Sequence, residues 1–344
     1  MKRWNNDYNQ SAHPSIIAAI SELEGQNFPG YGTDNMCEKA KAEIRKYIHN
    51  ENAEIHFLVG GTQTNYIVIA SALRPYQGII SAATGHISLH ETGAIENTGH
   101  KVITIEGKNG KLDASMIEEI ASEYDDCGIK EHIVMPKMVF LSFPSEYGTI
   151  YSKEELINIR KVCDKYNLYL YIDGARLGYG LGADECDVTL ADICNIADVF
   201  YIGGTKCGAL FGEAVVILND CLKEGFRNHM KQNGALLAKG WLLGVQYYEL
   251  FKDGLYFDIT KHADTQAMRI KKAFSDNNIP FAFESFTNQQ FVILTNEQME
   301  KIGKNNIFEY DSKIDDNHHV IRFCTSWATK ISEVDELIEE IKEL

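Results

Sequence analysis

The sequence predicts an α/β protein built on a mostly parallel sheet, with a smaller α+β domain at its C-terminal end. Three observations support this prediction. Short, nearly continuous apolar runs are typical of strands that are buried on both faces of a sheet. These runs alternate with segments of helical periodicity over about 170 residues, as strand–helix–strand units do. After residue 245 the pattern changes to a long helical segment, two strands and a final helix.

The elements of the large domain are expected between 51 and 245. The first 50 residues contain one or two helical patterns and a glycine-rich bend at 28–32, and we expect them to form an arm or part of the small domain. The strands of the large domain are predicted at 78–83, 101–105, 137–143, 168–172, 198–202 and 214–218. Amphipathic helices lie between them, such as 153–166, whose apolar stripe includes Leu156 and Ile159.

The small domain is predicted over 246–344. It begins with a helical pattern at 257–276, which leads into strands at 290–295 and 319–325. A final amphipathic helix is expected at 331–344.

The composition excludes several classes of protein. With 33 basic and 49 acidic residues, the formal net charge of −16 argues against nucleic acids or anionic membranes as partners. No apolar stretch is long enough for a transmembrane helix, and the first residues lack the apolar core of a signal peptide. The eight cysteines show neither CxxC nor zinc-type spacing, so no metal site is predicted and free thiols of a cytoplasmic protein are expected.

An acid and an amine each follow a predicted strand. Asp173 opens the tetrapeptide Asp-Gly-Ala-Arg, and Lys206, 33 residues later, ends Gly-Gly-Thr-Lys. This separation is about one βαβ unit, so the two strands can be neighbours in the sheet. Ligands of open α/β sheets bind at the carboxyl ends of the strands. We therefore expect Asp173 and Lys206 to face one crevice.

This pair suits pyridoxal phosphate. A lysine holds that cofactor as a Schiff base, and a carboxylate pairs with its pyridinium nitrogen. The alternative is that Asp173 caps a helix and Lys206 is a solvated loop residue. The glycines that clear space around both residues favour the cofactor site.

A phosphate cradle is predicted at 59–65, Val-Gly-Gly-Thr-Gln-Thr-Asn, which precedes a helical pattern. Glycines let the backbone approach an anion, and a helix N-terminus offers free N–H groups. The alternative is an ordinary turn and helix cap. The segment is neither a GxGxxG nor a P-loop motif, which argues against a dinucleotide or nucleoside triphosphate site.

Three further side chains are candidates for the same site. His86 follows a predicted strand and could stack on a flat cofactor ring, although a lone histidine can also be structural. Arg176 is close to Asp173 in sequence and could contact the oxygen of the cofactor ring. Arg322 lies among apolar residues, where its planar guanidinium suits either a substrate carboxylate or an internal ion pair.

These motifs together resemble the threonine aldolase/β-eliminating lyase family of fold-type-I pyridoxal phosphate enzymes. The resemblance covers most of the chain and rests on Tyr31-Gly32, 60–65, 86–93, 173–176, Lys206 and Arg322. It implies a seven-stranded sheet flanked by helices. It also implies dimers or tetramers with shared active sites, in which the loop of Tyr31 reaches a neighbouring subunit.

The resemblance also implies a role for each candidate residue. Lys206 is expected to bind the cofactor covalently, Asp173 to pair with the pyridine nitrogen, and His86 to stack on the ring. The phosphate is expected on Gly61, Thr62 and Gln63. Contacts to the substrate or to the ring oxygen are expected from Asp7, Tyr31, Arg176 and Arg322.

The segment at 144–148 departs from the family pattern. Many members of the family carry Thr-His-Asn-Gly here, and that histidine is implicated in handling the β-hydroxyl of the substrate. This chain has Pro-Ser-Glu-Tyr-Gly, so Glu146 takes the place of the histidine. We expect Glu146 to bind the β-hydroxyl directly or through water, with His86 or water as an alternative base and a surface or capping glutamate as the alternative interpretation. A second altered segment, at 231–240, offers Lys231 or Lys239 in place of a family arginine.

The function predicted from the resemblance is cleavage of a β-hydroxy-α-amino acid, L-threonine or L-allo-threonine, to glycine and an aldehyde. A β-elimination or another lyase reaction on the same cofactor is the first alternative. A non-catalytic protein that binds pyridoxal phosphate is the second, and an aminotransferase is less favoured by the order of the motifs.

Overall fold

A seven-stranded sheet with the strand order β2-β8-β7-β6-β5-β3-β4 forms the centre of the large domain in the computed structural model, which describes residues 1–344. All neighbouring strands are parallel except β8, which runs antiparallel to both β2 and β7. The strands are β2 (Glu54–Leu58), β3 (Gln77–Ala82), β4 (Lys101–Ile105), β5 (Met135–Ser142), β6 (Tyr169–Asp173), β7 (Val199–Gly203) and β8 (Glu213–Ile217). The six predicted strands are all present, within two residues of their predicted bounds.

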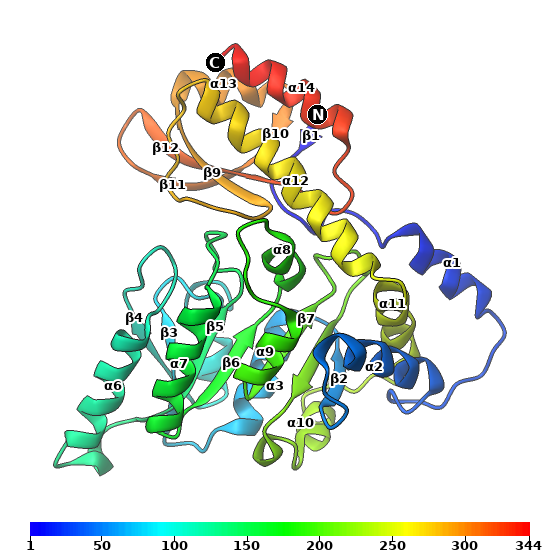
Figure 1. Cartoon of the computed structure of the whole chain (residues 1–344), viewed down its shortest axis with the longest axis vertical. Coiled ribbons are helices and arrows are strands. Elements are labelled where there is room, and N and C mark those ends of the chain that lie inside the picture. The colour runs from blue at the N-terminus through cyan, green and yellow to red at the C-terminus, as the bar shows by residue number, and fades with distance from the viewer.

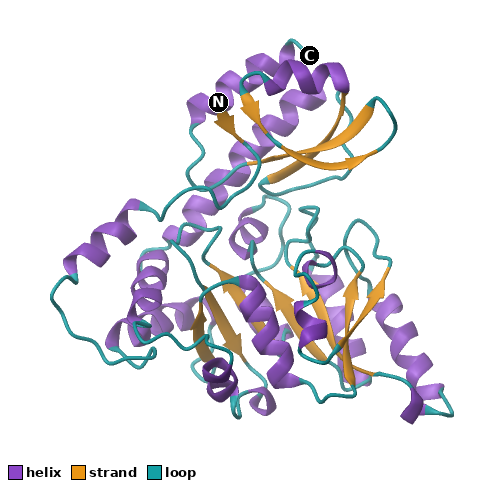
Figure 2. Ribbon diagram, turned by 180° about the vertical axis from the view of Figure 1, so that it is seen from behind, coloured by secondary structure: helices purple, strands orange, loops and turns teal.

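Helices cover both faces of this sheet, so the strands alternate between two cores (Figures 1 and 2). In β6, Leu170 and Ile172 belong to a core of 45 residues, whereas Tyr171 between them belongs to one of 19 residues. Burial on both faces explains the continuous apolar runs of the sequence. The helices are α1 (Pro14–Glu22), α2 (Asn35–Ile48), α3 (Gly61–Ala72), α4 (His86–Leu89), α5 (Ala94–Asn97), α6 (Ala114–Asp126), α7 (Lys153–Lys165), α8 (Leu177–Gly182), α9 (Leu190–Ile196), α10 (Phe226–Gln232) and α11 (Trp241–Phe251).

The small domain is a three-stranded antiparallel sheet with helices on one side (Figure 2). Its strands are β9 (Gln289–Thr295), β11 (Glu309–Lys313) and β12 (His318–Cys324), in the order β11-β12-β9. The helices α12 (Leu255–Asp276), α13 (Asn296–Gly303) and α14 (Ile331–Lys342) enclose a separate core that includes Trp4. The long α12 runs from the large domain into the small one (Figure 1).

The N-terminal residues contact both domains. The two-residue strand β1 (Lys2–Arg3) pairs with β10 (Asn306–Ile307) of the small domain. In contrast, α2 packs along α11 of the large domain. Residues 4–34, which include α1, connect these two contacts, and residues 4–13 pass the carboxyl edge of the large sheet, where Asp7 contacts Arg176.

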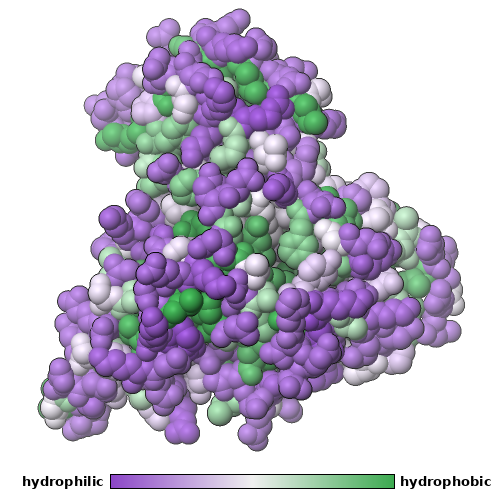
Figure 3. All heavy atoms as spheres, in the orientation of Figure 1, coloured by the Kyte–Doolittle hydropathy of each residue, from purple (hydrophilic) through white to green (hydrophobic).

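Hydrophilic residues cover most of the face seen in Figure 3, and hydrophobic ones are gathered in smaller patches. This surface agrees with a sequence in which 24% of the residues are charged. None of the helices combines the length and the apolar character needed to cross a membrane.

Candidate active site

Asp173 and Lys206 lie at one edge of the large sheet, as predicted. Asp173 is the last residue of β6, and Lys206 follows the end of β7 by three residues. The two strands are parallel neighbours, with Tyr171 opposite Val199. Both residues line a cavity of about 380 Å³ together with the glycine-rich turn that precedes α3. The predicted spacing therefore brings an acid and an amine into one cavity.

Glycine is required at position 174 because the two strand ends approach each other closely. A Cβ atom at Gly174 would lie 1.9 Å from the carbonyl oxygen of Tyr201. Gly203 donates its N–H to the carbonyl of Gly174, which joins the ends of β7 and β6. The glycine of Asp-Gly-Ala-Arg thus allows the close approach that places Asp173 beside the Lys206 loop.

The Asp173 carboxylate is held by three donors. Its Oδ1 accepts hydrogen bonds from the Tyr201 hydroxyl at 2.5 Å and from the Ala175 N–H at 2.9 Å. Its Oδ2 accepts one from Asn65 Nδ2 at 3.0 Å. Burial and the neighbouring carboxylate raise the pKa of Tyr201, which keeps that hydroxyl protonated and able to donate. All three partners are donors, so the Asp173 carboxyl group acts only as an acceptor in this structure.

The Lys206 amine lines the cavity and makes neither a hydrogen bond nor an ion pair with the protein. Its backbone carbonyl accepts a hydrogen bond from the buried Tyr179 hydroxyl at 2.5 Å, which fixes the loop. Desolvation within the protein lowers the pKa of Lys206, and the positive charge of Arg176 lowers it further. A lysine that loses its proton more readily is a better nucleophile toward a carbonyl group.

The N-terminus of α3 supplies the predicted anion cradle. The N–H groups of Gly61, Thr62 and Gln63 have no acceptor in the protein, and Gly61 and Thr62 line the cavity. A Cβ atom at Gly61 would lie 3.2 Å from the Tyr201 hydroxyl, so the lack of a side chain there keeps the cradle open. The Gln63 side chain turns away and accepts the Val59 N–H at 3.3 Å, which leaves only its backbone N–H for an anion.

His86 begins α4 and lines the same cavity. Its Nδ1 lies 2.8 Å from Oε1 of the buried Glu91, and that oxygen also accepts from Asn65 Nδ2 at 2.7 Å. Asn65 is fixed by the Tyr171 hydroxyl, which donates to Asn65 Oδ1 at 2.6 Å. A continuous polar chain therefore orients the His86 ring and the Asp173 carboxylate together.

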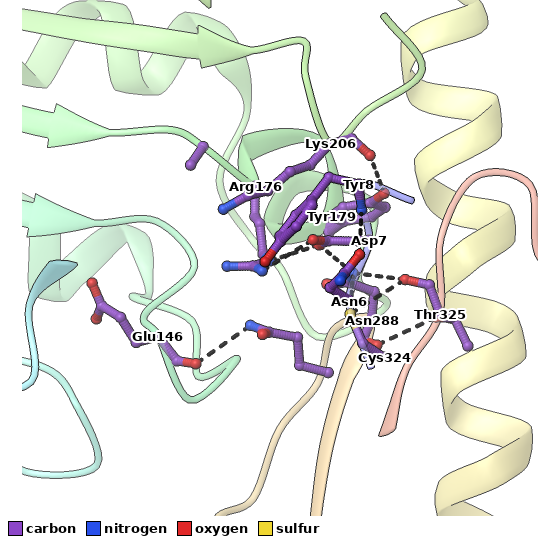
Figure 4. A network of polar contacts seen from close by, with 12 residues as sticks. Asn6, Asp7, Tyr8, Glu146, Arg176, Tyr179, Lys206, Asn288, Cys324 and Thr325 are labelled. Carbon is purple, nitrogen blue, oxygen red and sulfur yellow. Dashed lines mark hydrogen bonds and ion pairs between the residues drawn. The ribbon is translucent and has the colours of Figure 1, made fainter. Parts of the chain in front are cut away.

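Glu146 is also brought into this cavity, from the loop after β5. Its Oε1 accepts the backbone N–H of His86 at 2.8 Å and the hydroxyl of Ser142 at 2.5 Å. Burial is the largest effect on Glu146 and raises its pKa. Glu146 is half-buried, so it is not a surface glutamate, but its hydrogen bond from the N–H of the first residue of α4 is a contact of the capping alternative. Figure 4 shows Glu146 joined to the small domain through its backbone carbonyl, which accepts from Gln289 at 3.3 Å.

Asp7 and Arg176 form a buried ion pair, and Figure 4 shows the two side chains pointing toward each other. Arg176 donates from Nε to Asp7 Oδ2 at 2.7 Å and from a terminal nitrogen to Oδ1 at 3.1 Å. Asn288 of the small domain donates to the same carboxylate at 2.9 Å. Asp7 is fully buried and does not line the cavity, whereas Arg176 does. The structure thus places Asp7 against Arg176, and not at the position of the expected substrate contact.

The Asp7→Asn substitution is expected to lower the free energy of unfolding by roughly 3 kcal/mol at neutral pH, because it leaves Arg176 as an uncompensated buried charge. Urea unfolding measures this loss. Asp184→Asn is the matched control, since it removes an exposed pair with Lys261 and should cost less than about 0.5 kcal/mol.

The effect of Asp7→Asn should also depend on pH. Coulombic attraction to Arg176 and Lys206 outweighs the effect of burial and lowers the pKa of Asp7 to about 2. A depressed folded-state pKa gives stability above the ordinary unfolded value of about 3.9, and this stability is lost as the pH falls through the folded value. The difference in the free energy of unfolding between the parental protein and Asp7→Asn should therefore shrink as the pH falls from about 4 to about 2. If that difference stays constant, the charge of Asp7 is not its cause.

Arg322 has no carboxylate partner, so the alternative of an internal ion pair is not what the structure shows. Its terminal nitrogens donate to Gln289 Oε1 at 3.2 Å and to the Asn5 carbonyl at 2.9 Å. Together with Lys206 and Arg176 it lines a second lobe of the cleft, of about 570 Å³, which opens between the domains. Arg322 therefore remains available to an anionic ligand.

Tyr31 lies outside this cleft in its own chain. It lines a separate small cavity with Arg227, and the Lys231 ammonium lies 4.4 Å from the centre of its ring. The Tyr31 residue is 43% exposed. Within one chain, the structure does not bring Tyr31 or Lys231 to Lys206.

The residues that the sequence analysis missed are polar groups that complete the site. Glu213 is 3% exposed and accepts the Gly204 N–H at 3.1 Å and the Thr205 hydroxyl at 2.8 Å. Burial raises the pKa of Glu213 to about 8. His90 and Tyr8 line the cleft as well. The only sequence signal for Glu213 is a single carboxylate at the start of an otherwise apolar run.

Comparisons with known proteins give a consistent result. A model of the beta-eliminating lyase family matches residues 14–297. The low specificity L-threonine aldolase of a Pseudomonas strain is 29% identical over 334 residues, which are 96% of this chain and 94% of that protein. The solved structure of Leishmania major threonine aldolase is 42% identical with a TM-score of 0.97, and covers 100% of this chain and 99% of that one. Cystalysin from Treponema denticola, a structure that contains pyridoxal 5′-phosphate, has a TM-score of 0.71 at 17% identity, over 100% of this chain and 90% of its own.

Proposed function

The chain belongs to the beta-eliminating lyase family, and on that premise we propose that it is a pyridoxal phosphate-dependent carbon–carbon lyase that cleaves L-threonine or L-allo-threonine to glycine and acetaldehyde. The resemblance seen in the sequence and the fold class are both confirmed. The observation that carries the proposal is the convergence of an unpaired lysine, a buried carboxylate and a free helix N-terminus in one cavity of a chain 42% identical to a threonine aldolase.

The residues of the cavity fit this cofactor. The free N–H groups of Gly61, Thr62 and Gln63 suit its phosphate. Asp173 is a hydrogen-bond acceptor suited to a protonated pyridine nitrogen, and Lys206 is an amine free to form the covalent link. His86, oriented by Glu91, offers a flat ring at the cavity wall. When bound, the cofactor withdraws electrons from the substrate Cα and so weakens the bonds to that atom.

The remaining residues position the substrate and move its proton. Arg322 binds the substrate carboxylate, because its guanidinium faces the cleft without an acidic partner. Arg176 is held in place by Asp7 and adds a second positive charge at the cleft. Glu146 accepts the proton of the β-hydroxyl, directly or through water, as the Cα–Cβ bond breaks. Its raised pKa makes it a stronger base than an ordinary glutamate.

Product analysis tests the proposed reaction. The purified protein is incubated with the stereoisomers of threonine and with serine, and the products are identified by mass spectrometry. Glycine and acetaldehyde in equal amounts are expected from threonine. An α-keto acid and ammonia would instead identify a β-elimination, and the absence of any turnover would favour a non-catalytic protein.

Replacing Glu146 with glutamine is expected to slow acetaldehyde release at least about tenfold, a barrier increase of about 1.4 kcal/mol. Glutamine keeps the size and the hydrogen bonds of the side chain but cannot accept the proton. In the parent enzyme, the rate should fall as the pH decreases through the raised pKa of Glu146, and this acidic limb should be absent from the variant.

The affinity for glycine, followed by the absorbance of the cofactor, should not change in Glu146→Gln. The exposed Glu297→Gln is the matched control and should keep the parental pH profile. If Glu146→Gln cleaves threonine at the parental rate, the base is His86 or a water molecule.

The proposal extends to the assembly and the location of the protein. We propose a homodimer or homotetramer in which Tyr31 completes the cleft of a neighbouring subunit. The exposed ring of Tyr31 and its distance from the cleft of its own chain support this arrangement. A cytoplasmic location is supported by eight cysteines that are all free thiols.

A further inference from the structure

Glu213 and Thr205 form a hydrogen-bonded pair in the cavity. They lie where the glycine-rich turn 59–62 meets the loop that carries Lys206. Glu213 begins β8 and lies between Leu58 of β2 and Gly203 of β7 in the register of the sheet. The first of these strands leads into the glycine-rich turn 59–62, and the second leads into the loop with Thr205 and Lys206. Thr205, Glu213 and the turn line the same cavity.

The Thr205 hydroxyl has one proton to donate, and the protonation state of Glu213 decides where that proton points. The hydroxyl oxygen accepts the Gly212 N–H at 3.0 Å and lies 2.8 Å from Glu213 Oε1. An ionised carboxylate only accepts, so Thr205 must then donate to Glu213. A protonated Glu213 can donate to Thr205 instead, and the Thr205 proton is then free to turn into the cavity.

We propose that Glu213 is a positioning residue that is protonated when a phosphate ester is bound, which turns the Thr205 hydroxyl toward the phosphate, and that it takes up this proton on binding wherever it is ionised beforehand. The proton comes from solvent, and no covalent bond of the protein changes. The inference rests on the proposed function only for the class of ligand, because its test measures binding and not turnover.

The charges around Glu213 place this proton exchange in an accessible pH range. Burial raises the pKa of Glu213 to about 8, and the carboxylate of Asp173 adds to this effect. The Lys206 ammonium and the donors Gly204 and Thr205 act in the opposite direction. The other titratable groups that face it are Tyr171, Tyr201, Tyr247 and Cys207. A bound phosphate dianion disfavours a nearby carboxylate and raises this pKa further.

The sign of the expected pH dependence follows from this shift. Below about pH 8, Glu213 is already protonated, so binding requires no proton. Above that pH, binding a phosphate ester must bring a proton with it. Above the pKa of Glu213, the uptake of one proton weakens binding by up to about tenfold for each unit by which the pH rises.

The experiment measures binding of glycerol 3-phosphate, a phosphate ester that has neither an aldehyde nor a titrating ring and cannot bond covalently to Lys206, to the full chain freed of its cofactor. Isothermal titration calorimetry in buffers of different ionisation enthalpy gives both the affinity and the number of protons taken up at about pH 7, 8 and 9. The parental chain should take up close to one proton at the highest pH and bind about fivefold to tenfold more weakly than at pH 8.

Three variants isolate the source of the proton. Glu213→Gln should take up none and bind with an affinity independent of pH, since its amide group imitates the protonated acid. Lys206→Ala should still show proton uptake, but at higher pH, because loss of the ammonium raises the pKa of Glu213 further. Glu249→Gln, a buried glutamate of α11, should behave as the parental chain does.

Thr205→Val tests the route through the hydroxyl independently of Glu213. It should bind the ligand more weakly and with clearly reduced proton uptake. Uptake that persists in Glu213→Gln would overturn the assignment of the proton. Full uptake in Thr205→Val would overturn the positioning role, because Glu213 would then act on the phosphate through its charge alone.

Discussion

Replacing Lys206 with alanine is expected to abolish the covalent attachment of pyridoxal phosphate and to reduce threonine cleavage by roughly a thousandfold or more, a barrier increase of about 4 kcal/mol. The amine of Lys206 is the one that lines the cavity with Asp173 and the free N–H groups of α3. Its lowered pKa favours the neutral form that reacts with an aldehyde. No other side chain of the cavity can form the same bond.

Borohydride reduction followed by peptide mapping measures the attachment directly. The mass of the reduced cofactor should be found on Lys206 in the parental enzyme and on no residue of Lys206→Ala. Lys231 and Lys239 are both exposed and provide the matched controls, since their alanine variants should keep the label. A label on either of these two lysines would refute the assignment of Lys206.

The strands of the large sheet were predictable because burial on both faces requires apolar residues in sequence. The missed strand β2 carries Glu54 and His56 in its five residues, and these interrupt the apolar run. All five residues of β11 are exposed, so no hydrophobic pattern marks it. The pairing of β1 with β10 joins residues about 300 positions apart, and two-residue strands have no periodicity to detect.

Two residues of the candidate site could be predicted from the order of the strands along the chain. Asp173 and Lys206 follow consecutive parallel strands, so their spacing alone brings them to one edge. The partner of each polar group was not predictable in this way. Arg176 pairs with Asp7, 169 residues away, because residues 4–13 pass the carboxyl edge of the sheet. Glu213 reaches the cavity through the antiparallel return of β8, which local sequence does not reveal.

Replacing Asp173 with asparagine is expected to reduce threonine cleavage by at least about a hundredfold, a barrier increase of about 2.7 kcal/mol, with much of the cofactor still bound. The substitution removes the negative charge that keeps a pyridine nitrogen protonated. It also places an amide NH₂ among groups that donate to the carboxylate, namely Tyr201, Ala175 and Asn65.

The decisive measurement compares kcat with cofactor occupancy for the same preparation of Asp173→Asn. A charge-assisted hydrogen bond contributes roughly 1.5–3 kcal/mol, whereas the phosphate cradle and the covalent link to Lys206 are untouched by the substitution. Turnover should therefore fall much more than occupancy. Asp34→Asn controls for a buried aspartate that only caps a helix, and it should leave kcat within about twofold at a reduced melting temperature. If Asp173→Asn keeps the parental kcat, the carboxylate positions Tyr201 and Asn65 without a role in the reaction; if occupancy and turnover fall together, Asp173 serves to bind the cofactor.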